Sequence, residues 1–95
     1  MDLESIQETI KALQPDLERK YHIHSIGRFG SVVRNDFSNA SDVDIIVDFH
    51  QPIDIDFIEL ADFLEVALNR LVDLVSRKGI KPTYFAEIEP EIVYV

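Results

Sequence analysis

The chain has 95 residues, 46% of them hydrophobic, and its 18 acidic and 9 basic side chains give a formal net charge of −9. This length suits one domain, and the apolar content is enough for a core, which excludes a wholly disordered chain. The charge argues against a nucleic-acid-binding surface and favours a basic protein partner or a cation, although an acidic surface that only aids solubility explains it equally.

The sequence contains no cysteine, and its N-terminal segment has no signal-peptide apolar core. The lack of cysteine excludes disulfides and thiolate metal sites, and it suits a cytoplasmic protein. A membrane span needs about 20 consecutive apolar residues, and no stretch approaches that length. We therefore expect a single cytoplasmic domain over residues 1–95.

The first predicted element is an amphipathic helix near the N-terminus. Its apolar residues recur at spacings of three and four, at Leu3, Ile6, Ile10, Leu13 and Leu17. Pro15 falls inside this pattern, so we expect either a kink or two short helices. A first strand is predicted between Tyr21 and Phe29, with Gly27 interrupting its alternation.

The stretch from Gly30 to Asp48 carries the clearest chemical signal. After a small-residue turn and a polar loop, an apolar run contains Asp42 and Asp44, and it predicts a central, largely buried strand. Alternate strand residues share a face, so these two carboxylates would be neighbours, roughly 6.5–7 Å apart along the backbone. Adjacent carboxylates repel unless a cation compensates, and Mg²⁺ also leaves positions for phosphate oxygens. The pair predicts a metal-dependent, phosphate-handling site.

The turn before this strand has a possible role of its own. Residues 32–36 could form one or two helical turns, which would leave Gly30 and Ser31 at a helix N-terminus. Backbone N–H groups at such a position attract anions, including phosphate. A lone Gly-Ser pair is usually an ordinary turn, but its position shortly before the two aspartates favours phosphate binding.

A second helix is predicted after a loop over residues 51–56. Asp56 and Glu59 fit a variant of the capping box at its start. A helical apolar face follows, made of Phe57, Leu60, Phe63, Leu64, Ala67 and Leu68.

The next predicted strand, residues 71–75, has Asp73 as its only polar residue. An edge strand would let this carboxylate face water. Alternatively, Asp73 is a third acid that meets Asp42 and Asp44 from a neighbouring strand. Beyond a basic loop, residues 83–88 are predicted to form a helical turn or two, and residues 92–95 a last strand or an arm that adds to a partner.

Gly30-Ser31, ten residues and then Asp42-Val43-Asp44 resembles the GSx10DxD signature of the DNA polymerase β-like nucleotidyltransferases. The short chain, Arg34 after the Gly-Ser pair, Ser41 before the first aspartate and the later VDLV strand are similar to the minimal branch of that superfamily. This branch includes the MNT antitoxins that are paired with HEPN-domain toxins. The resemblance covers roughly residues 23–75.

The resemblance implies an α+β (α/β) fold with a small mixed sheet flanked by helices. It implies that two Mg²⁺ ions are held by the catalytic residues Asp42, Asp44 and Asp73. It also implies that the nucleotide is bound by Gly30, Ser31, Arg34 and Ser41. The family commonly has Arg-Gly after the Gly-Ser pair, whereas Asn35 follows here, and a salt bridge to Asp36 would explain Arg34 equally.

The implied activity is Mg²⁺-dependent transfer of AMP from ATP to a hydroxyl, a tyrosine of a HEPN toxin, by which the chain acts as an antitoxin. A hetero-oligomer with that toxin would supply the acceptor, and neither nucleic acid nor membrane would be bound directly. Two alternatives stay open: a non-catalytic module that occludes a basic partner, and a stand-alone transferase for a small molecule. A P-loop NTPase is excluded because no Gly-Lys-Ser/Thr follows a glycine-rich loop.

Overall fold

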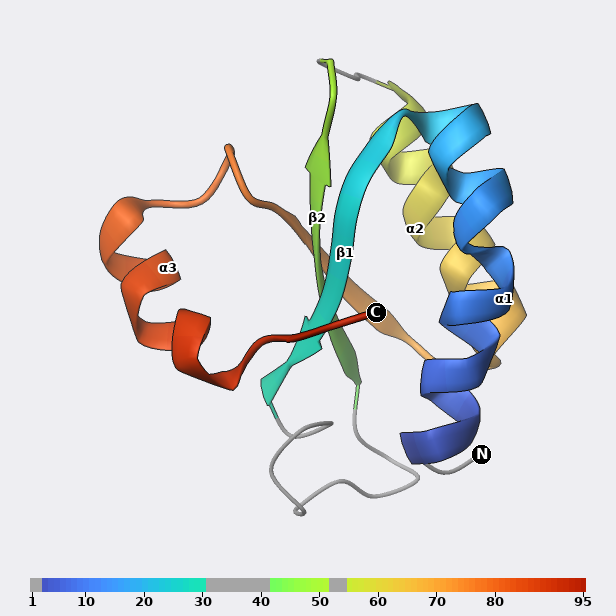
Figure 1. Cartoon of the computed structure of the whole chain (residues 1–95), viewed down its shortest axis with the longest axis horizontal. Helices are drawn as coiled ribbons and strands as arrows, with labels where there is room; N and C mark the ends of the chain where they lie inside the picture. Colours follow the sequence, from blue (N-terminus) through green and yellow to red (C-terminus); the bar gives the residue numbers. More distant parts are fainter. Residues whose placement is uncertain (1–2, 31–41, 52–54) are drawn as a thin grey trace.

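The computed structural model describes residues 3–30, 42–51 and 55–95 (Figure 1). In chain order the elements are α1 (Leu3–Tyr21), β1 (Ile23–Phe29), β2 (Val43–Phe49), α2 (Ile55–Leu68), β3 (Val72–Ser76), α3 (Pro82–Ile88), the 3-10 helix η2 (Glu89–Glu91) and β4 (Val93–Tyr94). The strands form one sheet in the order β3-β2-β1-β4, in which β2 and β3 are parallel and the other pairs antiparallel. The predicted α+β class, with a small mixed sheet flanked by helices, is confirmed.

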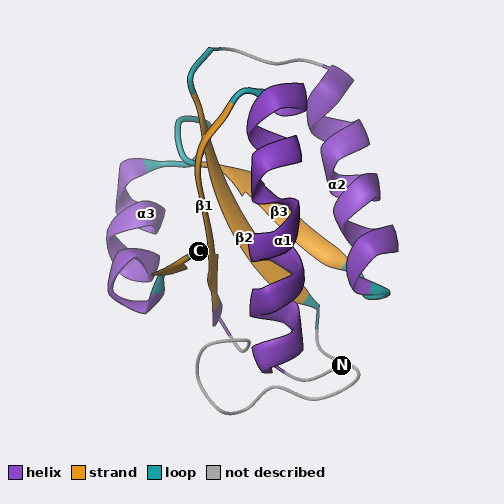
Figure 2. Cartoon of the chain, turned by 45° about the vertical axis from the view of Figure 1, so that its right-hand side comes forward, coloured by secondary structure: helices purple, strands orange, loops and turns teal. Residues whose placement is uncertain are grey.

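The sheet separates two layers of helices (Figures 1 and 2). α1 and α2 cover one face, and the main core between them and the sheet includes Val43, Ile45 and Val47 of β2. α3 covers the other face, where a smaller cluster includes Ile46. Because successive strand residues point to opposite faces, β2 contributes to both layers. The prediction that it is a central, buried strand is confirmed.

α1 continues through its proline. Pro15 lies inside a single helix, so the alternative of two short helices is wrong. Ile10 on one side of the proline and Leu17 on the other are both buried in the main core, which holds the two halves on one surface. Pro15 and Lys11 are exposed, so water can bond the Lys11 carbonyl that the proline leaves without its helical partner.

The start of α2 also differs from expectation. The helix begins at Ile55, so Asp56 lies within its first turn and the predicted capping box is wrong. Glu59 instead reaches α1, where its carboxylate accepts a hydrogen bond from the Tyr21 hydroxyl at 3.2 Å and pairs with Lys20 at 3.0 Å. A sequence pattern reports only local pairs, and this contact joins residues 38 positions apart.

The C-terminal segment adds the last edge strand to the sheet of its own chain. β4 pairs with β1 at Gly27 and Arg28, so the alternative of a free arm is wrong for the strand residues. A Cβ at Gly27 would lie 2.8 Å from Ile92 Cγ2 and 3.3 Å from the Val93 carbonyl oxygen. Glycine interrupts the alternation of β1 because β4 approaches it here. None of the helices in the described part of the chain is long and apolar enough to span a bilayer.

Candidate active site

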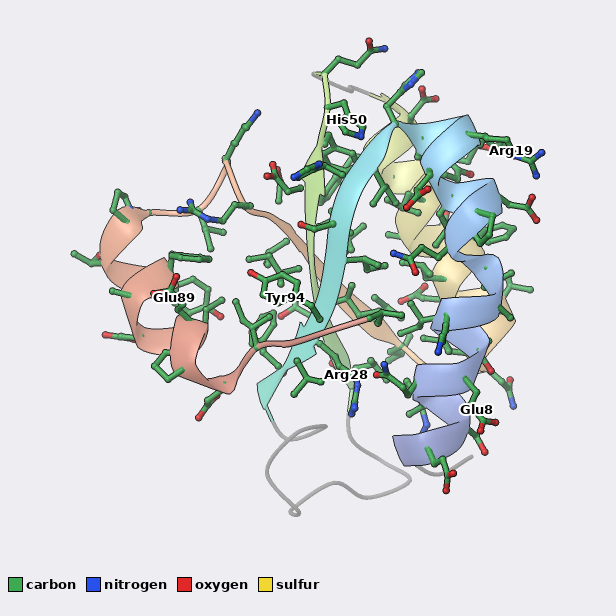
Figure 3. All side chains as sticks on the ribbon, viewed as in Figure 1. Glu8, Arg19, Arg28, His50, Glu89 and Tyr94 are labelled. Carbon is green, nitrogen blue, oxygen red and sulfur yellow. The ribbon has the colours of Figure 1, made fainter. Side chains whose placement is uncertain are left out.

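The predicted aspartates lie at the end of the sheet where β1 finishes and where β2 and β3 begin. Asp44 pairs with Phe29, the last residue of β1, on one side and with Asp73 of β3 on the other. Asp42 immediately precedes β2, just outside the paired residues. Asp44 is half-buried, and the other two aspartates are exposed. The start of α1 is at the same end of the molecule: Arg28, near the end of β1, lies beside it in Figure 3.

The parallel register brings two carboxylates side by side. Asp44 and Asp73 are direct partners on neighbouring strands, which lie about 4.8 Å apart. Partners in register point to the same face, and two residues further on Ile46 and Val75 both belong to the cluster under α3. Both aspartates therefore point to the α3 side of the sheet. β3 is an edge strand, so Asp73 is at once exposed to water and adjacent to Asp44.

Two hydrogen bonds fix where β3 starts. The Val43 N–H donates to the Leu71 carbonyl at 2.9 Å, and the Val72 N–H donates to Glu65 Oε2 of α2 at 2.9 Å. Sequence analysis did not single out Glu65. No local sequence pattern predicts this contact, because it depends on the turn at Asn69 between α2 and β3. Asn69 has a φ of +53°.

Gly30 carries a second constraint besides the predicted one. Its φ is +72°, a left-handed conformation that disfavours residues with a Cβ. A Cβ built at this position would also collide with the Asp44 carboxylate at Oδ2. The glycine therefore leaves room for the half-buried carboxylate, which is a reason for its presence that the sequence alone did not suggest. Phosphate binding by Gly30 remains a prediction.

Arg28 lies at the same end of the sheet but on the other face. Its register partner is Ile45, which packs under α1 and α2, and its Nε donates a hydrogen bond to Gln7 Oε1 at 2.5 Å. Burial lowers the pKa of this guanidinium below its usual value. The group supports the contact between β1 and α1.

Three other predicted residues, Ser31, Arg34 and Ser41, lie outside the described part of the chain, as does the possible helical turn over residues 32–36. Within residues 3–30, 42–51 and 55–95, no group of three His, Cys, Asp or Glu side chains is arranged to hold a metal ion. The neighbouring Asp44 and Asp73 carboxylates still fit Mg²⁺, which commonly binds one or two carboxylates together with substrate phosphates and water.

The chain is similar in sequence to proteins of one known family. Residues 9–94 match the nucleotidyltransferase domain family. Protein adenylyltransferase MntA of Thermococcus cleftensis is 38% identical over 96 residues, which span 100% of this chain and 97% of the relative.

Two solved structures share the fold. A protein described as a minimal nucleotidyltransferase is 30% identical, with a TM-score of 0.85 over 98% of this chain and 95% of that one. The structure of a tri-AMPylated HEPN toxin of Shewanella oneidensis in complex with its MNT antitoxin contains a chain that is 25% identical, with a TM-score of 0.71 over 97% of this chain and 70% of that one.

These matches confirm the resemblance to minimal nucleotidyltransferases and the enzyme class that the GSx10DxD pattern predicts. The family match extends over the whole described sheet, from α1 to β4. The chain therefore belongs to the nucleotidyltransferase domain family.

Proposed function

We propose that this chain is a Mg²⁺-dependent protein adenylyltransferase that transfers AMP from ATP to a tyrosine hydroxyl of a HEPN-type toxin and thereby acts as its antitoxin. The observation that carries the proposal is the register of Asp44 and Asp73 beside Gly30. Support for the donor and the acceptor comes from the relatives: one is named a protein adenylyltransferase, and another is described in complex with an AMPylated HEPN toxin.

The proposed roles follow from the chemistry of the side chains. Asp42, Asp44 and Asp73 would hold two Mg²⁺ ions, while Gly30, Ser31, Arg34 and Ser41 would bind the triphosphate. Bound Mg²⁺ would neutralise phosphate charge and lower the pKa of the acceptor hydroxyl.

Asp73 is exposed on the edge strand and could accept the proton of the incoming hydroxyl. The hydroxyl oxygen would form a bond to the α-phosphorus as the bond to pyrophosphate breaks. Because β3 is the edge strand, a hydroxyl of another protein could approach Asp73 from that side. The predicted cytoplasmic location is part of the same proposal, since it would bring the enzyme together with ATP and an intracellular toxin.

The test is to incubate the purified chain with ATP, Mg²⁺ and the protein encoded by the adjacent reading frame. Intact mass should increase on the partner by one or more adenylyl groups, and peptide fragmentation should assign them to tyrosine. Chelation of Mg²⁺ should stop the transfer. No added mass on a folded partner would overturn the proposal.

The matched control is Asp44→Asn, which keeps the size of the side chain but removes its charge. Loss of a carboxylate that binds the metal removes several kcal/mol of transition-state stabilisation, so the rate should fall on the order of 10³-fold. Circular dichroism and thermal denaturation would establish that the variant is folded.

The charge of −9 favours a second candidate, a non-catalytic module that neutralises a basic partner by covering it. Under that alternative the double variant Asp42→Asn, Asp44→Asn would still neutralise the partner. Under the enzymatic proposal the double variant loses neutralisation. A stand-alone transferase would form nucleotide-dependent products from small molecules without any protein partner.

A further inference from the structure

The outer side of α2 carries exposed apolar side chains among its acidic residues. Leu60, Leu64 and Leu68 point inward and are fully buried, which completes the inward side of the helix. Ile58 is nevertheless 65% exposed and Val66 is 83% exposed. Exposed acidic side chains, Asp62 among them, lie between these apolar residues, so the outer side of α2 combines apolar and acidic groups. In Figure 2, α2 is the outermost element of the helix layer.

Further apolar side chains extend this region in two directions. Phe63 is 37% exposed on the side facing α1, next to a hollow of about 430 Å³ that Leu17 and Tyr21 also line. Leu71, in the turn between α2 and β3, is 66% exposed. We refer to Ile58, Asp62, Phe63, Val66 and Leu71 together as the α2 surface.

The charges around the α2 surface are acidic. α2 carries four carboxylates and no basic side chain in its sequence: Asp56, Glu59, Asp62 and Glu65. Asp62 lies between Ile58 and Val66 at intervals of four residues, so the three share one side of the helix. Of the nearby cations, Arg19 of α1 pairs with Asp16, Lys20 pairs with Glu59, and Arg70 follows α2 beside Leu71, so acidic side chains outnumber basic ones here.

This combination selects the kind of partner. Two copies of the chain meeting through α2 would bring acidic side chains against acidic side chains, which is costly at an interface. A helix that presents apolar side chains flanked by lysine or arginine would cover Ile58 and Val66 and complement the carboxylates. The charge of −9 for the whole chain acts in the same direction and would accelerate association with a basic protein.

The α2 surface and the candidate carboxylates lie on opposite faces of the sheet, and the edge strand β3 connects them. Leu71 is two residues before Asp73, and its carbonyl accepts the hydrogen bond that begins the pairing of β2 with β3. A partner that lies along α2 and contacts Leu71 would therefore reach the edge strand β3, and it would extend around that edge to approach Asp73 and Asp44 on the other face.

We propose that the α2 surface is the docking site for the protein that receives the nucleotide, and that this protein presents a helix with apolar side chains flanked by basic ones. The inference rests on the proposed function, because it assigns the docking site of the acceptor protein. It gives this small domain a way to hold a macromolecular substrate.

The experiment uses the whole chain and the protein encoded by the adjacent reading frame. Val66→Asp and Ile58→Asp should each lower the affinity for that protein at least about tenfold, as expected for apolar anchors at an interface. They should raise the KM for the partner and leave kcat, ATP binding and the melting temperature unchanged. The matched control is Tyr84→Asp on α3, which replaces an aromatic residue that is 39% exposed on the other side of the sheet and should leave the affinity unchanged.

Charge is tested separately. Asp62→Lys should weaken binding and reduce its dependence on salt, because fewer opposite charges are then screened. Wild-type affinity that does not change with salt would overturn the basic character of the partner.

The remaining outcomes separate this inference from the proposed function. Normal affinity in both Val66→Asp and Ile58→Asp overturns the docking site, even if AMP is transferred. A wild-type dimer that these variants dissociate would overturn it as well, since a second copy would then occupy the surface. Binding that depends on Val66 but leads to no AMP transfer would support the docking site and overturn the enzymatic proposal.

Discussion

The two faces of the sheet differ in how many buried side chains cover them. Among the described residues, the cluster under α1 and α2 contains thirteen buried side chains, whereas the cluster under α3 contains four. The carboxylates Asp44 and Asp73 are on the thinly covered face. Within the described ranges, most of the buried apolar side chains therefore lie on one side of the sheet, and the two carboxylates lie on the other. β2 serves both, because its residues alternate between the faces.

The largest expected effect is on stability, from truncation of the main core. Leu64 is fully buried, so Leu64→Ala should lower the free energy of unfolding by about 3 kcal/mol. Urea denaturation would measure this. AMP transfer per folded molecule should be unchanged, because the substitution is on the face away from the carboxylates. Ile58→Ala, at an exposed position of the same helix, should change the free energy of unfolding by less than about 0.5 kcal/mol.

The second prediction concerns the opposite face, where activity should fall more than stability. In Gly30→Ala the alanine must keep the left-handed φ of the glycine, which costs about 1–2 kcal/mol in stability. It must also displace the Asp44 carboxylate, and a displacement of that kind typically lowers the rate about 100-fold. Steady-state transfer rates would measure the loss of activity, and thermal denaturation would measure the loss of stability.

Gly79→Ala is the matched control for that substitution. A Cβ there would lie 3.5 Å from Ser76 Cβ, which is ordinary van der Waals contact. We expect no loss of transfer activity. Equal losses in the two alanine variants would mean that the collision with Asp44 does not explain the need for glycine at position 30.

A smaller effect is expected from the packing of α3. The Arg77 guanidinium carbon lies 3.6 Å from the centre of the Phe85 ring, a cation–π contact. Arg77→Met keeps an apolar chain over the ring and removes the charge, so it should lower the free energy of unfolding by about 0.5–1 kcal/mol. Thermal denaturation would detect this as a fall in Tm of a few degrees. Lys78→Met, at the next and exposed position, should leave the Tm unchanged.

The smallest expected effect is a dependence on pH on the well-packed face. The hydrogen bond from Lys20, and then its positive charge, lower the pKa of Glu59 below its usual value. A lowered pKa in the folded state stabilises the protein above the ordinary carboxyl pKa, and this stabilisation is lost as the pH falls through the folded value. The difference in unfolding free energy between the wild type and Glu59→Gln should therefore shrink between about pH 5 and pH 3. A difference that grows on acidification would contradict this assignment.

The sequence predicted the fold well where periodicity was strong. Alternation across residues 43–49 and the short apolar run containing Asp73 located β2 and β3, and the helical spacing of leucines located α2. It failed where a distant contact decided the outcome. Pro15 was tolerated because a shared core holds both halves of α1, and Glu59 contacts α1 instead of capping its own helix.

The candidate residues of the site could be predicted from the sequence, but the way they pair across the strands could not. Spacing paired Asp42 with Asp44 but left Asp73 either facing water or meeting them, and only the resemblance implied that the three form one group. Neither could show that Asp44 and Asp73 are direct partners. That pairing depends on a turn and on the hydrogen bond that the Val72 N–H donates to the Glu65 carboxylate, seven positions earlier in the chain. The collision that keeps position 30 a glycine likewise involves a residue from the next strand.

The pairing of Asp44 with Asp73 depends on the number of residues between α2 and β3. If one residue were inserted between Leu68 and Val72 and β3 slid by one position, Val72 or Leu74 would take the place beside Asp44 and Asp73 would turn towards the helices. Such a protein could retain its helices, strands and every acidic side chain and still be inert. Among homologous sequences, the length of this connection should therefore distinguish active members from inactive ones better than a count of conserved aspartates.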